Sequence, residues 1–281
     1  MKKQFLLVYI LFGCIVFEAY SQIGIFYSTD KDLSNSLINY IYQDKRNYIW
    51  VATEDGLNKF DGIKFTVYKN DPNDSTSLKN NYVRCLFEDS KDRFWIGCIN
   101  GLQQFDRKTN TFEEIKIFSS TNKRIYPHII SIIEANDGCI WISTSGEGIL
   151  KISEKNDKTF QTVATINSEL PTPFLTSIFQ DSSGKFWIGT ANYGLYLYDA
   201  STGQMHAFNV RNRKIGNNEI SAITEDDNKN IFVGTLSGGL YVFDRQHFSF
   251  VPLKDAAGNT SLPVKSLFFD RKQNMLLVGT D

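Results

Sequence analysis

Short apolar runs alternate with polar turn residues along most of the chain, and one arrangement of both recurs roughly every 45 residues. Its clearest part is a strand-like run that opens on a large aromatic residue. The copies are WVATEDGLNKFD from Trp50, WIGCINGLQQFD from Trp95, WISTSGEGILKIS from Trp141, WIGTANYGLYLYD from Trp187 and FVGTLSGGLYVFD from Phe232, with LVGTD from Leu277 opening a sixth. This spacing predicts a repeat protein in which each unit is one small sheet.

A second β-rich run precedes each of these segments and usually ends in Asp. The copies are INYIYQD at Ile38, VRCLFED at Val83, IISIIEAND at Ile129, LTSIFQD at Leu175, ISAITEDD at Ile220 and VKSLFFD at Val264. In the second unit the pattern predicts strands over residues 83–88, from Trp95, up to Phe105 and around residues 112–117, with turns between them. Four short antiparallel strands in such a unit are typical of a β-propeller blade.

The recurring residues have expected structural roles. A large flat ring fills the gap between neighbouring blades, so we expect core positions for Trp50, Trp95, Trp141 and Trp187. A positive backbone φ is expected in the turn before the third strand, at Gly56, Gly101, Gly148, Gly194 and Gly239. Backbone hydrogen bonds should be accepted in the first turn by Asp44, Asp89, Asp181, Asp226 and Asp270.

The repeat count predicts an all-β protein with five complete blades and two strands of a sixth. Ile25-Phe26-Tyr27 occupies the place before the first inner strand that Phe65-Thr66-Val67-Tyr68 occupies before the second. We therefore expect an outer strand there, belonging to a blade whose other strands come last in the chain, because such closure removes a free sheet edge. The interpretation is a fragment of a longer polypeptide and of a seven-bladed ring.

The N-terminus and the charge bear on location and partners. Two lysines, an apolar run from Phe5 to Phe17 and the small residues Ala19 and Ser21 predict a signal peptide over residues 1–21, followed by the propeller over residues 22–281. A lipoprotein cysteine at Cys14 is the alternative. The net charge of −1 on 281 residues argues against nucleic acid or an anionic membrane as a partner of this region.

Three cysteines remain after residue 21, namely Cys85, Cys98 and Cys139. Their spacing is not that of a metal site, so buried thiols are expected. Cys85 and Cys98 fall on neighbouring strands of one predicted hairpin. A disulfide between them stays open on this reasoning.

Segments such as WIGTANYGLYLYD from Trp187 and FVGTLSGGLYVFD from Phe232, with the form WVATEDGLNKFDG in the first repeat, resemble the two-component regulator propeller repeat. The chain departs from that pattern at three positions, where Ser143 replaces Gly, Ile149 replaces Leu and Phe232 replaces Trp. Each replacement is of a similar size class to the residue that it replaces. The resemblance implies the periplasmic sensory region of a hybrid two-component system from Bacteroidetes that responds to glycans or oligosaccharides. It also implies a homodimer, and continuation into a second propeller, an immunoglobulin-like domain, a membrane helix, a histidine kinase, a receiver and a DNA-binding domain.

Residues that could perform catalysis are few. The histidines His128, His206 and His247 lie in different repeats, and no nucleophile, zinc or phosphate-binding motif occurs. The sequence therefore predicts no catalytic residue, no metal ligand and no cofactor. Two alternatives to sensing remain, an exported propeller enzyme such as a lyase, which would need acids beside a histidine such as His128, and a passive protein-interaction scaffold.

The expected ligand site is the face where loops from second to third strands meet loops that enter each blade, because these loops converge on the axis. Amide, acidic and aromatic residues there suit a sugar, whose hydroxyls form hydrogen bonds and whose C–H faces stack on rings. The predicted ligand-binding residues are Asn100, Arg124, Tyr126, His128, Glu147, Asn192 and Tyr193, within a wider set that includes Glu54, Asp55, Asn81, Tyr82 and Asn218.

Overall fold

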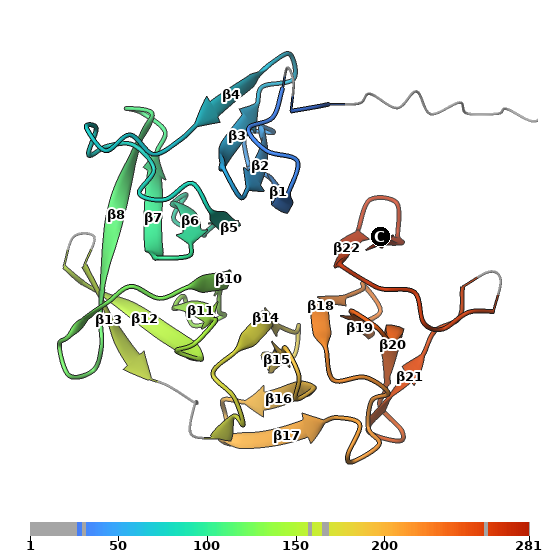
Figure 1. Cartoon of the computed structure of the whole chain (residues 1–281). Coiled ribbons are helices and arrows are strands. Elements are labelled where there is room, and N and C mark those ends of the chain that lie inside the picture. The colour runs from blue at the N-terminus through green and yellow to red at the C-terminus, as the bar shows by residue number, and fades with distance from the viewer. Residues whose placement is uncertain (1–26, 30–31, 157–158, 165–168, 256–257, 281) are drawn as a thin grey trace, which may run out of the picture.

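The computed structural model describes residues 27–29, 32–156, 159–164, 169–255 and 258–280. Successive small sheets are arranged around a common centre, with the first strand of each sheet innermost (Figure 1). The fold is therefore an all-β propeller, as the repeat predicted. The predicted signal peptide, Ile25 and Phe26 lie outside the described residues. The ring of Tyr27 lies 5.3 Å from that of Phe60 and 5.1 Å from that of Phe65, at the outer side of the first sheet.

The first three blades contain the chain up to residue 164. Blade 1 consists of β1 (Ile38–Gln43), β2 (Ile49–Thr53), β3 (Gly56–Phe60) and β4 (Phe65–Tyr68). Blade 2 consists of β5 (Val83–Glu88), β6 (Phe94–Cys98), β7 (Gly101–Asp106) and β8 (Thr111–Phe118), with β9 (Arg124–Ile125) beside β8. Blade 3 consists of β10 (Ile129–Glu134), β11 (Ile140–Thr144), β12 (Ile149–Asn156) and β13 (Thr159–Ala164).

The remaining blades follow the same order. Blade 4 consists of β14 (Leu175–Gln180), β15 (Phe186–Thr190), β16 (Leu195–Asp199) and β17 (Gln204–Phe208). Blade 5 consists of β18 (Ile220–Glu225), β19 (Ile231–Thr235), β20 (Gly239–Asp244) and β21 (Ser249–Pro252). Two strands of a sixth blade follow, β22 (Ser266–Asp270) and β23 (Met275–Gly279). The predicted five four-stranded blades and the two further strands are confirmed, whereas β9 is an additional strand that was not predicted.

One pairing differs from simple blade geometry. The outer strand β13 of blade 3 pairs in parallel with β8 of blade 2, where the backbone of Phe160 lies opposite Ile117. β8 has 8 residues, whereas the fourth strands of blades 1, 4 and 5 have 4 or 5. Its second half therefore extends past its own blade and joins the next one, so blades 2 and 3 form one continuous sheet.

The tryptophans lie between blades, as predicted. Trp187 of blade 4 is 2% exposed, and its ring centroid lies 5.2 Å from Phe243 and 5.7 Å from Phe250 of blade 5. Trp95 of blade 2 contacts Phe160 of blade 3 in the same way, at 5.4 Å. Each ring fills the space between two blades and so couples their packing.

A buried carboxylate organises the turn that precedes three of the four tryptophans. Asp181 Oδ1 accepts the backbone N–H of Ser183 at 2.9 Å and of Lys185 at 3.0 Å, while Oδ2 accepts Trp187 Nε1–H at 2.8 Å. Asp44 and Asp89 bind their turns and tryptophans similarly. The predicted backbone role is confirmed, and the bond to the indole is an addition that ties the turn to the core.

Repeats three and five break this pattern in opposite ways. Ala135 stands at the Asp position of repeat three, and Trp141 Nε1 there is buried without a hydrogen-bond partner among the described residues. In repeat five the indole is absent because Phe232 replaces Trp. The amide of Asn230 donates to Asp226 Oδ2 at 2.8 Å and supplies the missing partner.

A repeated contact links neighbouring blades on the side of these turns. The acceptor is the side chain of the last residue of a blade's first strand. The donor is a backbone N–H of the previous blade, about two residues after the end of that blade's first strand. Glu88 Oε2 accepts from Lys45 N at 2.9 Å, and Gln180 Oε1 accepts from Asn136 N at 2.8 Å. Glu225 binds both the N–H and the hydroxyl of Ser182 at 2.9 Å. The blades are thus held by hydrogen bonds outside the hydrophobic core.

The turn glycines have the predicted positive φ, and two of them also allow close approach. Gly194 has φ of +87°, and a Cβ there would lie 2.3 Å from the carbonyl oxygen of Phe208. Gly239 has φ of +86°, and its Cβ would lie 1.9 Å from the carbonyl oxygen of Thr260. Only glycine fits such contacts with backbone.

Cys85 and Cys98 occupy neighbouring strands as predicted but are free thiols, and both are buried. Burial raises the pKa of the Cys98 thiol to about 12. Because the thiolate is the reactive form, we expect both to resist iodoacetamide in the folded chain at pH 8 and to react in denaturant, while Cys139 reacts faster than either. Mass spectrometry of labelled peptides would measure this, and rapid native labelling of Cys85 or Cys98 would contradict it.

Candidate functional site

A pocket of about 880 Å³ lies on the axis of the propeller, where the inner strands meet the loops that were expected to converge. Its walls come from blades 2 to 5 and the start of blade 6. Its lining includes Arg84, His128, Phe174, Thr176, Tyr193, Ser221 and Lys265. The volume falls in the range of ordinary small-ligand sites.

The floor of this axial pocket is built from one repeated backbone irregularity. In the five complete blades the register of the first strand shifts after its first residue, as between Val83 and Cys85 or between Leu175 and Ser177. The residue inside each shift is therefore a β-bulge residue, and the side chains at Arg84, Ile130, Thr176 and Ser221 line the pocket. Bulges of this kind re-aim side chains beside functional sites.

Several polar atoms of these walls have no hydrogen-bond partner. They are Arg84 Nε, His128 Nε2, Thr176 Oγ1 and Ser221 Oγ, all buried, and they make up four of the nine such atoms among the described side chains. Buried polar groups are nearly always satisfied in folded proteins. Four such groups around one open pocket can be satisfied there by water or by the polar atoms of a ligand.

Two aromatic rings flank the same pocket. Phe174, just before β14, is 54% exposed, and Tyr193, in the turn after β15, is 50% exposed. Exposed single hydrophobic residues are common, but two aromatic rings on one polar pocket form a surface suited to stacking. The arrangement combines apolar faces with hydrogen-bonding groups, which is what a sugar ring requires.

The charge of the pocket is one-sided. Arg84 and Lys265 contribute cationic side chains, and none of the described residues that line the pocket is acidic. Arg84 Nη1 lies 3.4 Å from Asn39 Oδ1, and no ion pair involves Arg84 in the described part of the chain. Burial, and then the nearby Arg84 cation, lower the pKa of His128 below its usual value of 6.5, so the imidazole is neutral at pH 7.

Backbone hydrogen bonds hold the loops around the pocket. Ser145 N donates to His128 O at 2.9 Å within blade 3, and Gly148 N donates across to Pro173 O at 3.1 Å at the entry to blade 4. Gly194 N donates to Asn218 O at 3.0 Å in the next pair of blades. The walls are thus positioned before any ligand arrives, which lowers the entropic cost of binding.

The structure separates the predicted site residues into three groups. His128, Asn192 and Tyr193 line the axial pocket. Glu147 lies in the turn after β11 beside that pocket's loops, and burial raises its pKa. Asn100 and Tyr126 line a separate cavity of about 110 Å³ together with Glu114, which forms an ion pair with Arg124. Five of the seven residues therefore line two separate cavities, and Glu147 and Arg124 lie beside them.

Sequence reasoning missed Arg84, Phe174, Thr176 and Ser221. A signal for three of them was present, because the second position of the inner run reads Asn39, Arg84, Ile130, Thr176, Ser221 and Lys265 while its neighbours stay largely apolar or small. When the residue type at one position varies between polar, charged and apolar from repeat to repeat, core packing does not determine the residue at that position. Without the bulge, that position would have been assigned to the blade interior or its far face.

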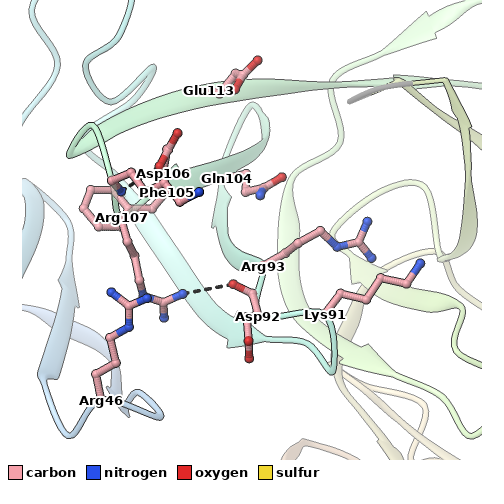
Figure 2. Close-up of a pocket in the computed structure, with 10 residues that line it drawn as sticks. Arg46, Lys91, Asp92, Arg93, Gln104, Phe105, Asp106, Arg107 and Glu113 are labelled. Atoms are coloured by element: carbon pink, nitrogen blue, oxygen red, sulfur yellow. Dashed lines mark hydrogen bonds between the residues drawn. The ribbon is translucent and has the colours of Figure 1, made fainter.

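A second cleft, of about 480 Å³, lies among the turns of blade 2 and is rich in cationic groups (Figure 2). Two of its five cationic side chains already have a structural role. Arg107 pairs with Glu88 at 2.9 Å and donates to the carbonyl oxygen of Asp92 at 3.1 Å, and Arg93 pairs with Asp89 at 2.6 Å. These contacts stabilise the turns and the junction of blades 1 and 2, so the axial pocket is the better candidate.

No constellation for catalysis is present among the described residues. His206 lies on the outer strand β17, and His247 binds Asp244 at 2.5 Å in an exposed turn. His128 lies in a pocket lined by no carboxylate. In the same part of the chain, no group of three His, Cys, Asp or Glu residues could hold a metal, and no helix is long and apolar enough to cross a membrane.

The fold defines an all-β propeller, and the comparison with known families makes this class more specific. A family profile described as "Two component regulator propeller" matches residues 32–55, 77–100 and 169–192. Each matched segment contains the first two strands of one blade and the turn between them, in blades 1, 2 and 4. These three segments of the chain therefore match the two-component regulator propeller repeat.

Relatives agree with this family. The chain is 37% identical to histidine kinase P4 of Formosa agariphila, over 60% of this chain and 16% of that protein. Among solved structures it is similar to the extracellular domain of a putative one-component system from B. thetaiotaomicron, with a TM-score of 0.67 and 18% identity over 90% of this chain and 41% of the other.

This structural similarity and the next one, at 18% and 14% identity, concern the fold alone. Virginiamycin B lyase from Staphylococcus aureus has a TM-score of 0.61 and 14% identity, with 84% of this chain and 76% of that one covered. The chain spans about a sixth of the curated histidine kinase and about two fifths of the solved extracellular domain. What those longer proteins do is thus a source of proposals for this chain.

Proposed function

We propose that this chain is the extracytoplasmic, ligand-sensing propeller of a hybrid two-component sensor, and that it recognises an oligosaccharide in the axial pocket. The observation that carries the ligand class is the pair of exposed rings at Phe174 and Tyr193 above a floor of unsatisfied polar groups. Stacking and hydroxyl pairing together are the usual requirements of sugar recognition.

The sensor role is supported by the family and its relatives. The repeats are those of two-component regulators, a similar protein is a histidine kinase, and a structural neighbour is an extracellular domain. The location outside the cytoplasm agrees with the signal peptide predicted over residues 1–21. The proposed output is a change in packing against further propeller, immunoglobulin-like and kinase domains and a dimer partner, with no catalysis in this region.

Stacking in the axial pocket can be tested with two single variants. We expect Phe174→Ala and Tyr193→Ala each to weaken binding of a cognate oligosaccharide roughly tenfold, because each removes apolar ring surface worth about 1–2 kcal/mol when a ligand covers it. The measurement is isothermal titration calorimetry of the full chain, after a glycan array has identified the saccharide.

Tyr126→Ala is the matched control, because Tyr126 is 56% exposed but lines the separate small cavity. It should bind as the parent chain does. If Tyr126→Ala alone weakened binding, the site would lie in that cavity. If no saccharide bound the parent chain, a passive scaffold would be the better interpretation.

A further inference from the structure

The axial pocket combines features that are unusual for a site that binds only neutral sugars. Arg84 projects from a β-bulge with Nε buried and without a partner, and no ion pair neutralises this cation within the described residues. The Arg84 side chain is partly exposed, its Nη1 donates to Asn39 Oδ1 at 3.4 Å, and its guanidinium lies 5.8 Å from the centroid of the Tyr82 ring. Neither contact supplies an anion, so the positive charge of Arg84 at the axis has no ion-pair partner among the described residues.

The residues around Arg84 favour an anionic ligand group as the partner of its positive charge. Lys265, from the position after the fifth blade that corresponds to Arg84, lines the same pocket. His128 adds a neutral imidazole with Nε2 unsatisfied, and Thr176 and Ser221 add hydroxyl groups. Hydroxyl and guanidinium donors around a carboxylate-free wall match the acceptor oxygens of a carboxylate or a sulfate.

We propose that the axial pocket selects an acidic saccharide, with the ligand's carboxylate or sulfate group bound by Arg84. Lys265 contributes to the positive potential, while Phe174 and Tyr193 contact the sugar faces. This inference rests on the proposed function for its saccharide part. The anion part stands on Arg84 and its neighbours alone.

The guanidinium is the appropriate group to vary. Arg84→Gln keeps a hydrogen-bonding side chain of similar reach but removes the charge, and it should weaken binding of an acidic oligosaccharide roughly 10- to 100-fold, the effect of losing charge-assisted hydrogen bonds. Arg84→Lys keeps the positive charge but lacks the planar guanidinium. Its affinity for the acidic oligosaccharide should lie between those of the parent chain and of Arg84→Gln. Lys91→Gln, an exposed lysine in the turns on the other face, is the matched control and should leave binding unchanged.

The probes are trigalacturonate, a sulfated galactan tetrasaccharide and cellotetraose, each titrated calorimetrically into the full chain. We expect one of the two acidic probes to bind, with affinity that falls as sodium chloride is raised, and cellotetraose to bind at least tenfold more weakly. Which acidic probe binds distinguishes a carboxylate from a sulfate. Circular dichroism of each variant establishes that folding is intact.

The outcomes separate this inference from the function on which it rests. If neutral cellotetraose bound as tightly as the acidic probes, or Arg84→Gln had no effect on them, the anion site would be wrong while saccharide sensing stood. If sodium sulfate or glucuronate bound in an Arg84-dependent way but no oligosaccharide did, the anion site would stand and the saccharide function would be wrong.

Discussion

Replacing Trp187 by Ala should lower the free energy of unfolding by about 3–5 kcal/mol, which is the range for a buried aromatic ring removed from a core. The ring is 2% exposed and packs against Phe243 and Phe250 of the next blade, so its loss opens a cavity between two blades. Urea denaturation, followed by the far-ultraviolet circular dichroism of the backbone, would measure the change in the free energy of unfolding.

Repeat five suggests a sharper variant of the same experiment. Trp187→Phe keeps an aromatic ring but leaves Asp181 Oδ2 without its indole donor, at a cost of roughly 1–3 kcal/mol for a buried unsatisfied group. Lys185 occupies the position at which Asn230 binds Asp226 in repeat five. Adding Lys185→Asn to Trp187→Phe should therefore restore part of the loss, by about 1 kcal/mol.

The control is Lys185→Asn in the parent chain, where the indole already satisfies Asp181 and no gain is expected. A Trp187→Phe variant as stable as the parent would show that the indole hydrogen bond contributes little. Equal effects of Lys185→Asn in both backgrounds would show that the residue acts independently of the carboxylate, contrary to the expected coupling.

Gly189→Val is expected to destabilise the chain by about 3 kcal/mol and to disrupt the axial pocket as well. Gly189 is the glycine of the W-I-G-T segment, and a Cβ there would lie 2.7 Å from Ile220 Cγ2 of the next blade and 2.3 Å from Ser177 Oγ. Overpacking of a dense core costs roughly 1–3 kcal/mol. Since Ile220 and Thr176 line the pocket, ligand affinity should fall together with stability.

Repeat three offers the comparison. Ser143 stands at the glycine position there, its Oγ lies 2.7 Å from Ser131 Oγ, and Leu175 occupies the position of Ile220. We expect Gly189→Ser to cost less than Gly189→Val, and Gly189→Ser with Ile220→Leu to recover further. Equal stability of the Val and Ser variants in urea would contradict a steric origin.

Much of the architecture was predictable because each blade is made from a single stretch of sequence. Hairpins between adjacent strands depend on local turn residues, and Asp89 with Gly101 mark such turns whatever the rest of the chain does. The position of Trp95 between neighbouring blades was predicted because a tryptophan recurs there in four repeats. Repetition turned a weak local preference into a strong prediction.

The lining of the candidate pocket was anticipated only in part. The sequence singled out loops of one face, and His128, Asn192 and Tyr193 of those loops line the axial pocket. Asn100 and Tyr126 were assigned to the same site but line another cavity. Loop position alone shows which face a residue approaches, but not whether it lies near the axis or near the rim.

By itself the sequence determined the blade count in this chain, the order of strands, the buried tryptophans and the turns, because these depend on contacts within a repeat or between adjacent ones. Only the tertiary structure decided which residues line one pocket. Arg84, Thr176 and Ser221 are separated by whole repeats, and they meet because a bulge turns each one toward the axis and successive blades surround that axis. The parallel pairing of β8 with β13 was likewise decided by strand length in space, which no local pattern specifies.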